Sequence, residues 1–410
     1  MAGKDDTAVL AEPLALSEGK TAPNRIVYQA MEGNDAADDG RPTETTLWRY
    51  RQLAEGTPGL IFIEATAITA NGKARRNQLM ITEETASGVE KLIAEIRRTS
   101  PKTLVLVQIT HSGRQSGKGF AEPVCAYPSP GEGLRYLSKT EIRELSATFV
   151  RAAVLAEKVG ADGIDFKHCH GYLGIEFLRP ANVRDDEFGG SFENRTRLFR
   201  ETVAAMKDKL ATREFLIGCR FCAFEGVKGG FGTSGPGEEK EDLTEVIEFV
   251  RSCESLGLHY INVSAGIPKT TPWITRPTTK QPIRVADHVR WTETVKRTTS
   301  MVVIGSAYSC IESCRKKLAG EPYRLGEGFL RCAAENVRRN RTDMVGVGRQ
   351  SFADPEFARK ILSGETSGIS FCTTCGRCTE LLVNDQKVWC AVFNGDYRNR
   401  YLESKKDGPK

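Results

Sequence analysis

Residues 140–167 read TEIRELSATFVRAAVLAEKVGADGIDFK, a long segment with helical periodicity followed by the short run GIDFK. Runs of this kind predict strands that are buried on both faces, as in a parallel sheet. Helical periodicity is also found at 242–256, where apolar residues fall on one stripe. A buried strand that alternates with an amphipathic helix is the repeating unit of α/β folds.

Seven further apolar, β-branched runs accompany GIDFK, and each is followed by a helical pattern. Eight such units predict a (β/α)8 TIM barrel that holds most of the 410 residues. A doubly wound sheet is the alternative, but no GxGxxG follows any of the runs. The expected strands are Ile26–Met31, Gly59–Thr66, Thr103–Ile109, Gly163–Lys167, Phe215–Phe221, Leu258–Ser264, Met301–Ser306 and Asp343–Gly348.

Composition restricts the class of protein. With 40% hydrophobic and 27% charged residues, the chain has the composition of a globular protein with a full core. A net charge of +5 with dispersed basic residues predicts no nucleic-acid partner, and no apolar stretch is long enough to predict a membrane span. The N-terminal sequence MAGKDDTAVLAEPLAL has neither the basic start nor the apolar run of a secretory signal, so a cytoplasmic location is expected.

Four of the twelve cysteines gather near the C-terminus, at Cys372, Cys375, Cys378 and Cys390. In a reducing compartment, the spacing C-x2-C-x2-C-x11-C predicts metal ligation rather than disulfides. Three closely spaced thiolates and one distant thiolate suit a [4Fe–4S] cluster, and tetrahedral zinc is the alternative. The expected organisation is an N-terminal extension at 1–21, a barrel at 22–365, and a cysteine-rich module with a polar tail at 366–410.

Active sites of barrels lie at the C-terminal ends of the strands. Small residues at the ends of the last two expected strands, Gly305-Ser306-Ala307 and Gly346-Val347-Gly348-Arg349, fit a site for one phosphate group. The end of the fourth strand reads KHCHGYLG at 167–174. A metal site or a Cys169 thiolate is possible there, but strand alternation sends neighbouring side chains to opposite faces and disfavours a tetrahedral ion.

Residues 168–195, HCHGYLGIEFLRPANVRDDEFGGSFENR, resemble the signature segment of the old yellow enzyme family of flavin-dependent oxidoreductases. Asn24-Arg25-Ile26-Val27, Gln108 with His111-Ser112-Gly113-Arg114, and Gly348-Arg349 with Ala353-Asp354-Pro355 match the family in the same order, so the similarity spans about 22 to 363. The cysteine-rich extension resembles the segment after the barrel in the 2,4-dienoyl-CoA reductase branch, although its second gap is one residue shorter.

The resemblance implies an FMN-dependent ene-reductase. Gln108 would bind the pyrimidine edge of the flavin, and Arg220 would stabilise the reduced ring. Tyr172 would donate the proton, with His170 and Lys167 on the substrate carbonyl. Two residues depart from the family pattern: Lys167 stands where a histidine is common, and Glu32 stands where Thr or Cys usually lies near the flavin. The remaining expected flavin contacts are Ala30, Met31, Ala65, Gly305, Ser306, Ala307, Gly348 and Arg349.

The expected substrate is an α,β-unsaturated ketone, acid or thioester. The FAD- and NADPH-binding half that usually follows in the dienoyl-CoA reductase branch does not follow here. A partner flavoprotein or ferredoxin-type protein is therefore expected to deliver electrons through the cluster, with direct reduction by NAD(P)H as the alternative. A homo-oligomer is also expected. Competing hypotheses are an NAD(P)H-reduced flavoprotein with a zinc tail, a barrel lyase with a Lys167 Schiff base, and an electron-transfer subunit.

Overall fold

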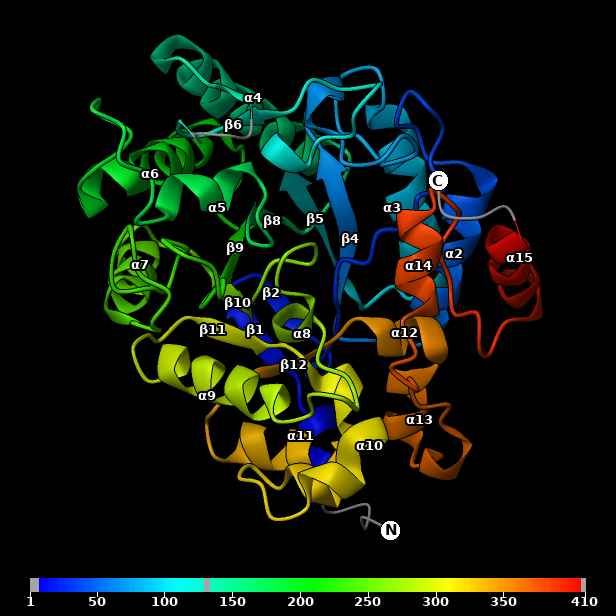
Figure 1. Cartoon of the computed structure of the whole chain (residues 1–410). Helices are drawn as coiled ribbons and strands as arrows, with labels where there is room; N and C mark the ends of the chain where they lie inside the picture. Colours follow the sequence, from blue (N-terminus) through cyan, green and yellow to red (C-terminus); the bar gives the residue numbers. More distant parts are fainter. Residues whose placement is uncertain (1–6, 129–132, 407–410) are drawn as a thin grey trace.

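The computed structural model describes residues 7–128 and 133–406. Eight parallel strands close into a barrel in the order β10-β11-β12-β3-β4-β5-β8-β9, and helices surround it (Figure 1). The predicted TIM barrel is thus confirmed, and each barrel strand overlaps a predicted one. The strands are β3 (Ile26–Tyr28), β4 (Leu60–Ala67), β5 (Leu104–Thr110), β8 (Gly163–His168), β9 (Leu216–Cys222), β10 (Tyr260–Ser264), β11 (Val302–Gly305) and β12 (Met344–Val347).

The helix predicted at 140–159 is α4, and it begins where the side chains of Ser138 and Glu141 each accept a hydrogen bond from the other's backbone N–H. Its apolar stripe, which includes Ile142, Leu145 and Phe149, is buried. The helices of the barrel region are α2 (Glu44–Glu55), α3 (Ala86–Thr99), α4 (Lys139–Lys158), α5 (Leu173–Leu178), α6 (Phe192–Lys209), α7 (Thr244–Ser255), α8 (Pro272–Thr275), α9 (Arg284–Lys296), α10 (Ile311–Cys314), α11 (Phe329–Arg338), α12 (Arg349–Ala353) and α13 (Phe357–Ser363).

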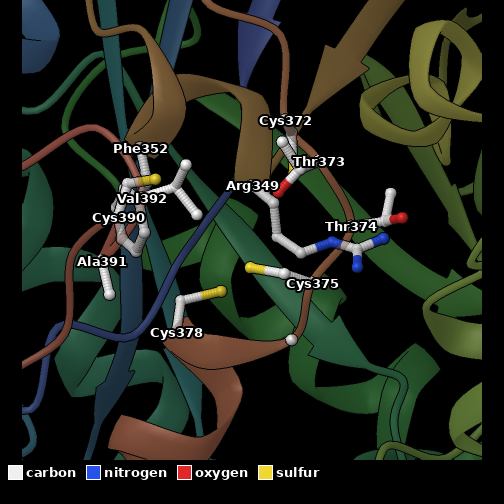
Figure 2. A pocket seen from close by; sticks show the side chains of 11 residues that line it. Arg349, Phe352, Cys372, Thr373, Thr374, Cys375, Cys378, Cys390, Ala391 and Val392 are labelled. Atoms are coloured by element: carbon white, nitrogen blue, oxygen red, sulfur yellow. The ribbon is translucent and has the colours of Figure 1, made fainter. Parts of the chain in front are cut away.

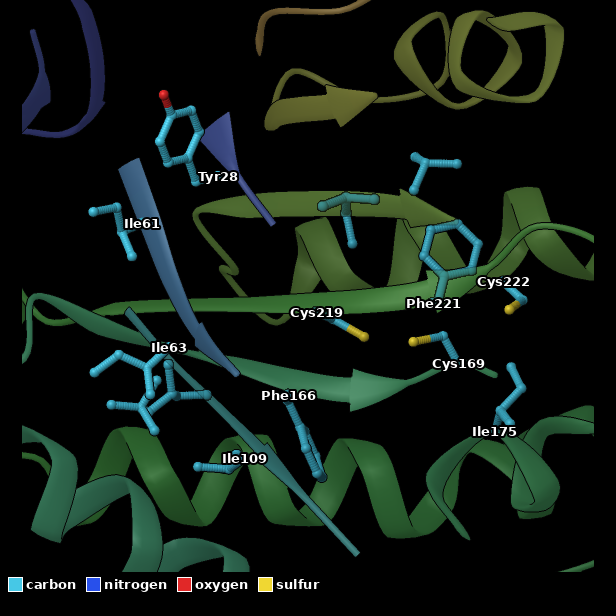
Figure 3. Packing of buried hydrophobic residues seen from close by; sticks show 14 of the residues in the cluster. Tyr28, Ile61, Ile63, Ile109, Phe166, Cys169, Ile175, Cys219, Phe221 and Cys222 are labelled. Atoms are coloured by element: carbon cyan, nitrogen blue, oxygen red, sulfur yellow. The ribbon is translucent and has the colours of Figure 1, made fainter. Parts of the chain in front are cut away.

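Apolar side chains pack on both sides of the barrel wall, as the near-continuous apolar strands require. One cluster fills the barrel interior and includes Phe62 and Tyr260. The other lies between the strands and the helices and includes Phe166 and Phe221 (Figure 3). Among the described residues, no helix is long and apolar enough to cross a membrane.

An antiparallel hairpin precedes the first barrel strand, formed by β1 (Leu14–Ser17) and β2 (Lys20–Ala22). Its Leu16 and Ala22 side chains join the interior cluster. The hairpin therefore belongs to the barrel unit, and the predicted boundary between 21 and 22 falls within β2. Residues 1–6 of the predicted extension and 407–410 of the predicted tail lie outside the described residues.

The cysteine-rich segment packs against the barrel through α14 (Arg377–Val383), α15 (Gly395–Lys406) and the turns around them, which Figure 1 shows in orange to red beside α2 and α3. The backbone N–H of Val388 donates to the carbonyl of Gly33, at 2.8 Å. The Trp389 ring lies between Trp48 of α2 and Phe352 of α12, with ring centroids 5.5 and 4.6 Å away. The segment is thus docked on the loop after β3 and on the turn after β12.

Candidate functional site

The chain reverses sharply after β8. His170 and Gly171 have φ of 64° and 71°, the left-handed region that a residue other than glycine rarely adopts. The reversal makes Tyr172 the N-cap residue of α5, and the Leu173 N–H donates to the carbonyl of His111 at the end of β5. A strained non-glycine residue of this kind is often found at functional sites.

Tyr172 and Lys167, which are buried, form one cluster with the partly buried Glu32. The hydroxyl of Tyr172 donates to Oε1 of Glu32, at 2.8 Å. The Nζ atom of Lys167 lies 3.9 Å from the same oxygen and 3.5 Å from the centroid of the Tyr172 ring. The ion pair is too long for a hydrogen bond, so the ammonium acts on Glu32 and on the ring as a nearby charge.

Burial governs the proton affinities in this cluster. Burial, followed by the negative charge of Glu32, raises the pKa of Tyr172 well above its usual value. Burial lowers the pKa of Lys167, and Glu32 opposes that shift. Burial, with the positive charges of Arg220 and Lys167, holds the pKa of His170 well below 6.5. The His170 imidazole is therefore neutral at pH 7, and its Nε2 lies 2.8 Å from the Ser264 hydroxyl.

The loop that carries Glu32 is held on both sides. The Gly33 N–H donates to Oε2 of Glu64, at 2.9 Å. The buried guanidinium of Arg49 binds Asp35 through two hydrogen bonds of 2.7 and 3.0 Å, and it also binds Glu64. Sequence reasoning missed Arg49 and Asp35, because no spacing pattern links them to the site.

The polar side chains inside the mouth of the barrel pair with one another across strands. The Gln108 amide nitrogen donates to Oδ2 of Asp165 at 2.7 Å, and burial raises the pKa of Asp165 to about 6. The amides of Gln29 and Asn262 exchange two hydrogen bonds of 2.9 Å. Arg220 is different: it is 8% exposed, and its Nε has no hydrogen-bond partner in the described structure.

At the ends of β11 and β12, the small residues form tight turns. Ala307 has φ of 69°, and the Ser306 hydroxyl lies 3.2 Å from Nδ1 of His288. The Gly348 N–H donates to the Ser309 hydroxyl at 3.0 Å. Such turns bring backbone N–H groups close together, as anion sites require.

The Arg349 side chain extends from this turn toward the cysteines. Its guanidinium donates to the carbonyl of Pro277 at 3.2 Å and to Sγ of Cys310 at 2.8 Å. It lines the same pocket as Cys372, Cys375, Cys378 and Cys390, and Figure 2 shows the guanidinium among these side chains. The four predicted ligands thus line one pocket. In the described ranges, however, no three His, Cys, Asp or Glu side chains lie close enough together to hold a metal ion as they stand.

The flavin-lining residues expected from sequence lie around the same mouth. Ala65 is buried in β4, and its carbonyl accepts from the Gln78 amide at 2.6 Å. Ala30 and Met31 are partly buried beyond β3, and a Cβ on Gly348 would lie 2.9 Å from the Met31 sulfur. This contact places the ends of β3 and β12 against each other.

His168 and Cys169 belong to the core. His168 packs edge-on against Phe166 and Phe199, with ring centroids 4.4 and 4.9 Å away, and burial lowers its pKa to about 3. Burial raises the pKa of Cys169 to about 11, so its thiol stays protonated at neutral pH (Figure 3). KHCH is therefore not a thiolate site: His168 and Cys169 lie in the core, whereas Lys167 and His170 contact Glu32 and Ser264 at the mouth of the barrel.

Comparison with known proteins gives a family match. The model of the "NADH:flavin oxidoreductase / NADH oxidase family" matches residues 9–281. The chain is 30% identical to an NADH oxidase of Thermoanaerobacter brockii over 88% of its own length and 53% of that protein. It is also 30% identical to an NADPH dehydrogenase of Clostridium acetobutylicum, over 82% of the chain and 89% of that protein.

Two solved structures share the fold. A 2-naphthoyl-CoA reductase complex superposes with a TM-score of 0.80 at 22% identity, over 96% of this chain and 58% of that one. Morphinone reductase in complex with tetrahydroNAD superposes with a TM-score of 0.65 at 21% identity, over 87% of this chain and 90% of that one. The chain thus spans little more than half of the NADH oxidase and of the naphthoyl-CoA reductase.

Proposed function

Because the chain belongs to the NADH:flavin oxidoreductase / NADH oxidase family and is a flavin-dependent oxidoreductase, we propose that it reduces the activated C=C bond of an α,β-unsaturated ketone, acid or thioester. The observation that carries this proposal is the position of the Tyr172 phenol. It lies at the C-terminal end of the barrel, beside a buried ammonium and one strand from the unpaired Nε of Arg220. A neutral phenol in that place can protonate a developing carbanion.

The residues at the barrel mouth fit FMN. The buried Nε of Arg220 has no hydrogen-bond partner among residues 7–128 and 133–406, and an anionic flavin edge would supply one. The Gln108 side chain donates to Asp165, which leaves its carbonyl oxygen for a flavin N–H. Reduced FMN, when bound, supplies the hydride. The remaining contacts would be Ala30, Met31, Ala65, Gly305, Ser306, Ala307 and Gly348, the last four at the phosphate end. The guanidinium of Arg349, expected there from sequence, instead extends toward the cysteines.

The chain's own residues orient the substrate and move the proton. A neutral His170 can donate one hydrogen bond to the substrate carbonyl without becoming an imidazolium. The Lys167 ammonium has no hydrogen bond to Glu32, so its donors remain available to the same carbonyl. Tyr172 then gives its hydroxyl proton to the α-carbon.

The four cysteines would hold a [4Fe–4S] cluster, with zinc as the alternative. Their side chains line one pocket together with the half-buried Arg349. The positive charge of Arg349 is also near enough to Arg276 to help burial lower the pKa of that arginine. Two neighbouring cations favour an anion nearby, and four thiolates around a cluster or around zinc carry net negative charge. A cluster would supply one-electron transfer to the flavin from a partner flavoprotein or ferredoxin-type protein, whereas zinc would be structural and leave NAD(P)H as the reductant.

Anaerobic purification followed by metal analysis and a visible spectrum tests the cofactors. We expect FMN, and iron with acid-labile sulfide as a broad band near 400 nm that dithionite bleaches. Zinc without iron would exclude the cluster. A colourless protein that borohydride traps on Lys167 in the presence of a carbonyl substrate would overturn the flavin function in favour of a lyase.

The Tyr172→Phe variant tests the chemistry. We expect it to slow alkene reduction by roughly 10²–10⁴-fold, because the proton donor is lost, while flavin reduction keeps its rate. The two half-reactions are measured separately by rapid mixing. An equal loss in both half-reactions would contradict the proton-donor role.

A further inference from the structure

We propose that Glu32 relays the catalytic proton: its carboxyl group passes a proton through the hydroxyl of Tyr172 to the substrate carbon, and Lys167 balances the charge left on Glu32. This inference rests on the ene-reductase function proposed above. It assigns a role to a carboxylate that the family pattern does not place beside the flavin.

The geometry of the cluster is that of a resting relay. The Tyr172 hydroxyl donates to Glu32 Oε1 at 2.8 Å, so a proton can pass between the two oxygens without movement of either residue. The Lys167 Nζ lies 3.9 Å from the same Glu32 oxygen. One carboxylate, one ammonium and one neutral phenol together carry no net charge, which suits a buried site.

Charge explains why the tyrosine needs this partner. If Tyr172 gave up its proton beside an ionised Glu32, a tyrosinate and a carboxylate would lie within hydrogen-bond distance in a buried site. The pKa of the phenol is already raised by that carboxylate as well as by burial. A second negative charge would therefore oppose the transfer unless Glu32 enters the step protonated.

The relay balances atoms and charge. As the new C–H bond forms, the O–H bond of Tyr172 breaks, and the carboxyl O–H of Glu32 breaks to restore the tyrosine hydroxyl. The negative charge of the carbanion ends on the Glu32 carboxylate, next to the Lys167 ammonium. In the final state the restored tyrosine hydroxyl again donates to Glu32 Oε1, as it does in the structure.

The proton can be replaced from water through Glu32. Its side chain is 15% exposed, whereas that of Lys167 is 4% exposed. Tyr172 is 8% exposed. The loop also fixes Glu32 in place, because both the N–H and the carbonyl of Gly33 are hydrogen bonded, to Glu64 and to Val388.

The test compares wild type, Glu32→Gln, Tyr172→Phe and the double variant, each with FMN bound. Reoxidation of the reduced enzyme by 2-cyclohexenone is followed by anaerobic rapid mixing in H₂O and in D₂O. We expect Glu32→Gln to slow this step by roughly 10–100-fold and to enlarge its solvent isotope effect, because a glutamine cannot supply the proton. FMN content and the rate of dithionite reduction are measured for each variant, so that a slower reoxidation step is distinguished from a loss of flavin. Glu90→Gln, at an exposed position of α3, is the matched control and should match wild type throughout.

The double variant distinguishes a relay from a structural contact. Since Glu32 acts through Tyr172, adding Glu32→Gln to Tyr172→Phe should cause no further loss, whereas independent effects would multiply. Multiplied losses, or a Glu32→Gln enzyme with the wild-type rate and isotope effect, would overturn the relay. If Glu32→Gln loses FMN, Glu32→Asp is measured in its place. This variant keeps a carboxyl group that can carry the proton, so it should recover part of the reoxidation rate. A Glu32→Asp enzyme that binds FMN but recovers none of that rate would overturn the relay. A wild-type protein with FMN that no alkene reoxidises would instead overturn the proposed function, and the relay with it.

Discussion

At the scale of the residue, Lys167 and His168 show how one step along a strand separates two roles. Lys167 points to the barrel mouth and approaches Glu32 and Tyr172. His168 points the other way, against Phe166 and against Phe199 of α6. Successive side chains of a strand alternate between its two faces, so two adjacent residues can lie one in the site and the other in the core.

The buried His168 predicts a pH dependence of stability. Its pKa is lowered from about 6.5 to about 3 in the folded protein, so the unfolded chain binds the proton more tightly between these values. Stability is therefore complete above pH 6.5 and is lost as the pH falls toward 3. At pH 5 this one group costs about 2 kcal/mol relative to pH 8.

Replacing His168 by leucine should remove that share of the acid destabilisation. The measurement is urea unfolding of wild type and His168→Leu at pH 8 and pH 5. The difference between the two pH values should shrink by about 2 kcal/mol in the variant, whatever its absolute stability. An identical pH difference in both proteins would show that the histidine is not buried as a neutral group.

The site residues that sequence could predict are those that the chain itself brings together. Tyr172, His170 and Lys167 lie within six positions after one strand, so their proximity follows from the turn. The contact between Tyr172 and Glu32 joins residues 140 positions apart, and only barrel closure creates it. The sequence marked Glu32 as unusual, but it could not identify the partner.

At the scale of the element, the loop after β3 depends on a glycine beside a buried arginine. A Cβ on Gly33 would lie 2.4 Å from the Arg49 guanidinium, which is fully buried between Asp35 and Glu64. A buried charge that loses its partner destabilises a protein strongly. The position of Glu32 therefore depends on the absence of a side chain at the next residue.

Gly33→Ala should accordingly destabilise the protein by roughly 3 kcal/mol, because Arg49 must move away from its carboxylates. Thermal or urea unfolding checks this value. Gly368→Ala is the control, because a Cβ at this position meets no atom within 4 Å. The free energy of unfolding of this variant should stay within about 0.5 kcal/mol of that of wild type. A Gly33→Ala protein as stable as the control would show that Arg49 can be accommodated elsewhere.

Strand positions were predicted well because apolar runs and strands share one cause, burial on both faces. The ends were predicted less well. The first run was expected to continue to Met31, but β3 ends at Tyr28 and only the Gln29 N–H continues the pairing, with the Val347 carbonyl. Beyond Gln29 the chain turns to meet Arg49 and the cysteine-rich segment, and these distant contacts have no local signal in the sequence.

At the scale of the whole molecule, the cysteine-rich segment is part of the barrel face. It contacts the loop after β3 through Val388 and the turn after β12 through Cys372, whose N–H donates to the Gln350 side chain at 2.8 Å. Cysteine spacing predicted a shared site in this segment but not where it docks, because docking depends on the packing of Trp389 between α2 and α12.

Removing the Trp389 ring should loosen the cysteine-rich segment without unfolding the barrel. We expect Trp389→Ala to speed hydrogen exchange across 370–395 and across 31–35, with a loss of roughly 3–5 kcal/mol in the local opening free energy. Phe393→Ala, whose ring is 47% exposed, is the control and should leave exchange at 31–35 unchanged. Faster exchange confined to the immediate neighbours of residue 389 would contradict this coupling.

The pairing of β3 with β12 closes the barrel and has a consequence for biosynthesis. More than 300 residues separate these two strands, so one edge of β3 has no partner until nearly the whole barrel has been made. At roughly 5–20 residues per second, a ribosome needs on the order of 15–60 seconds to synthesise that interval. Over this time the nascent chain carries an open strand edge, which is a template for aggregation, and we expect chaperones to be most important for this protein in that window.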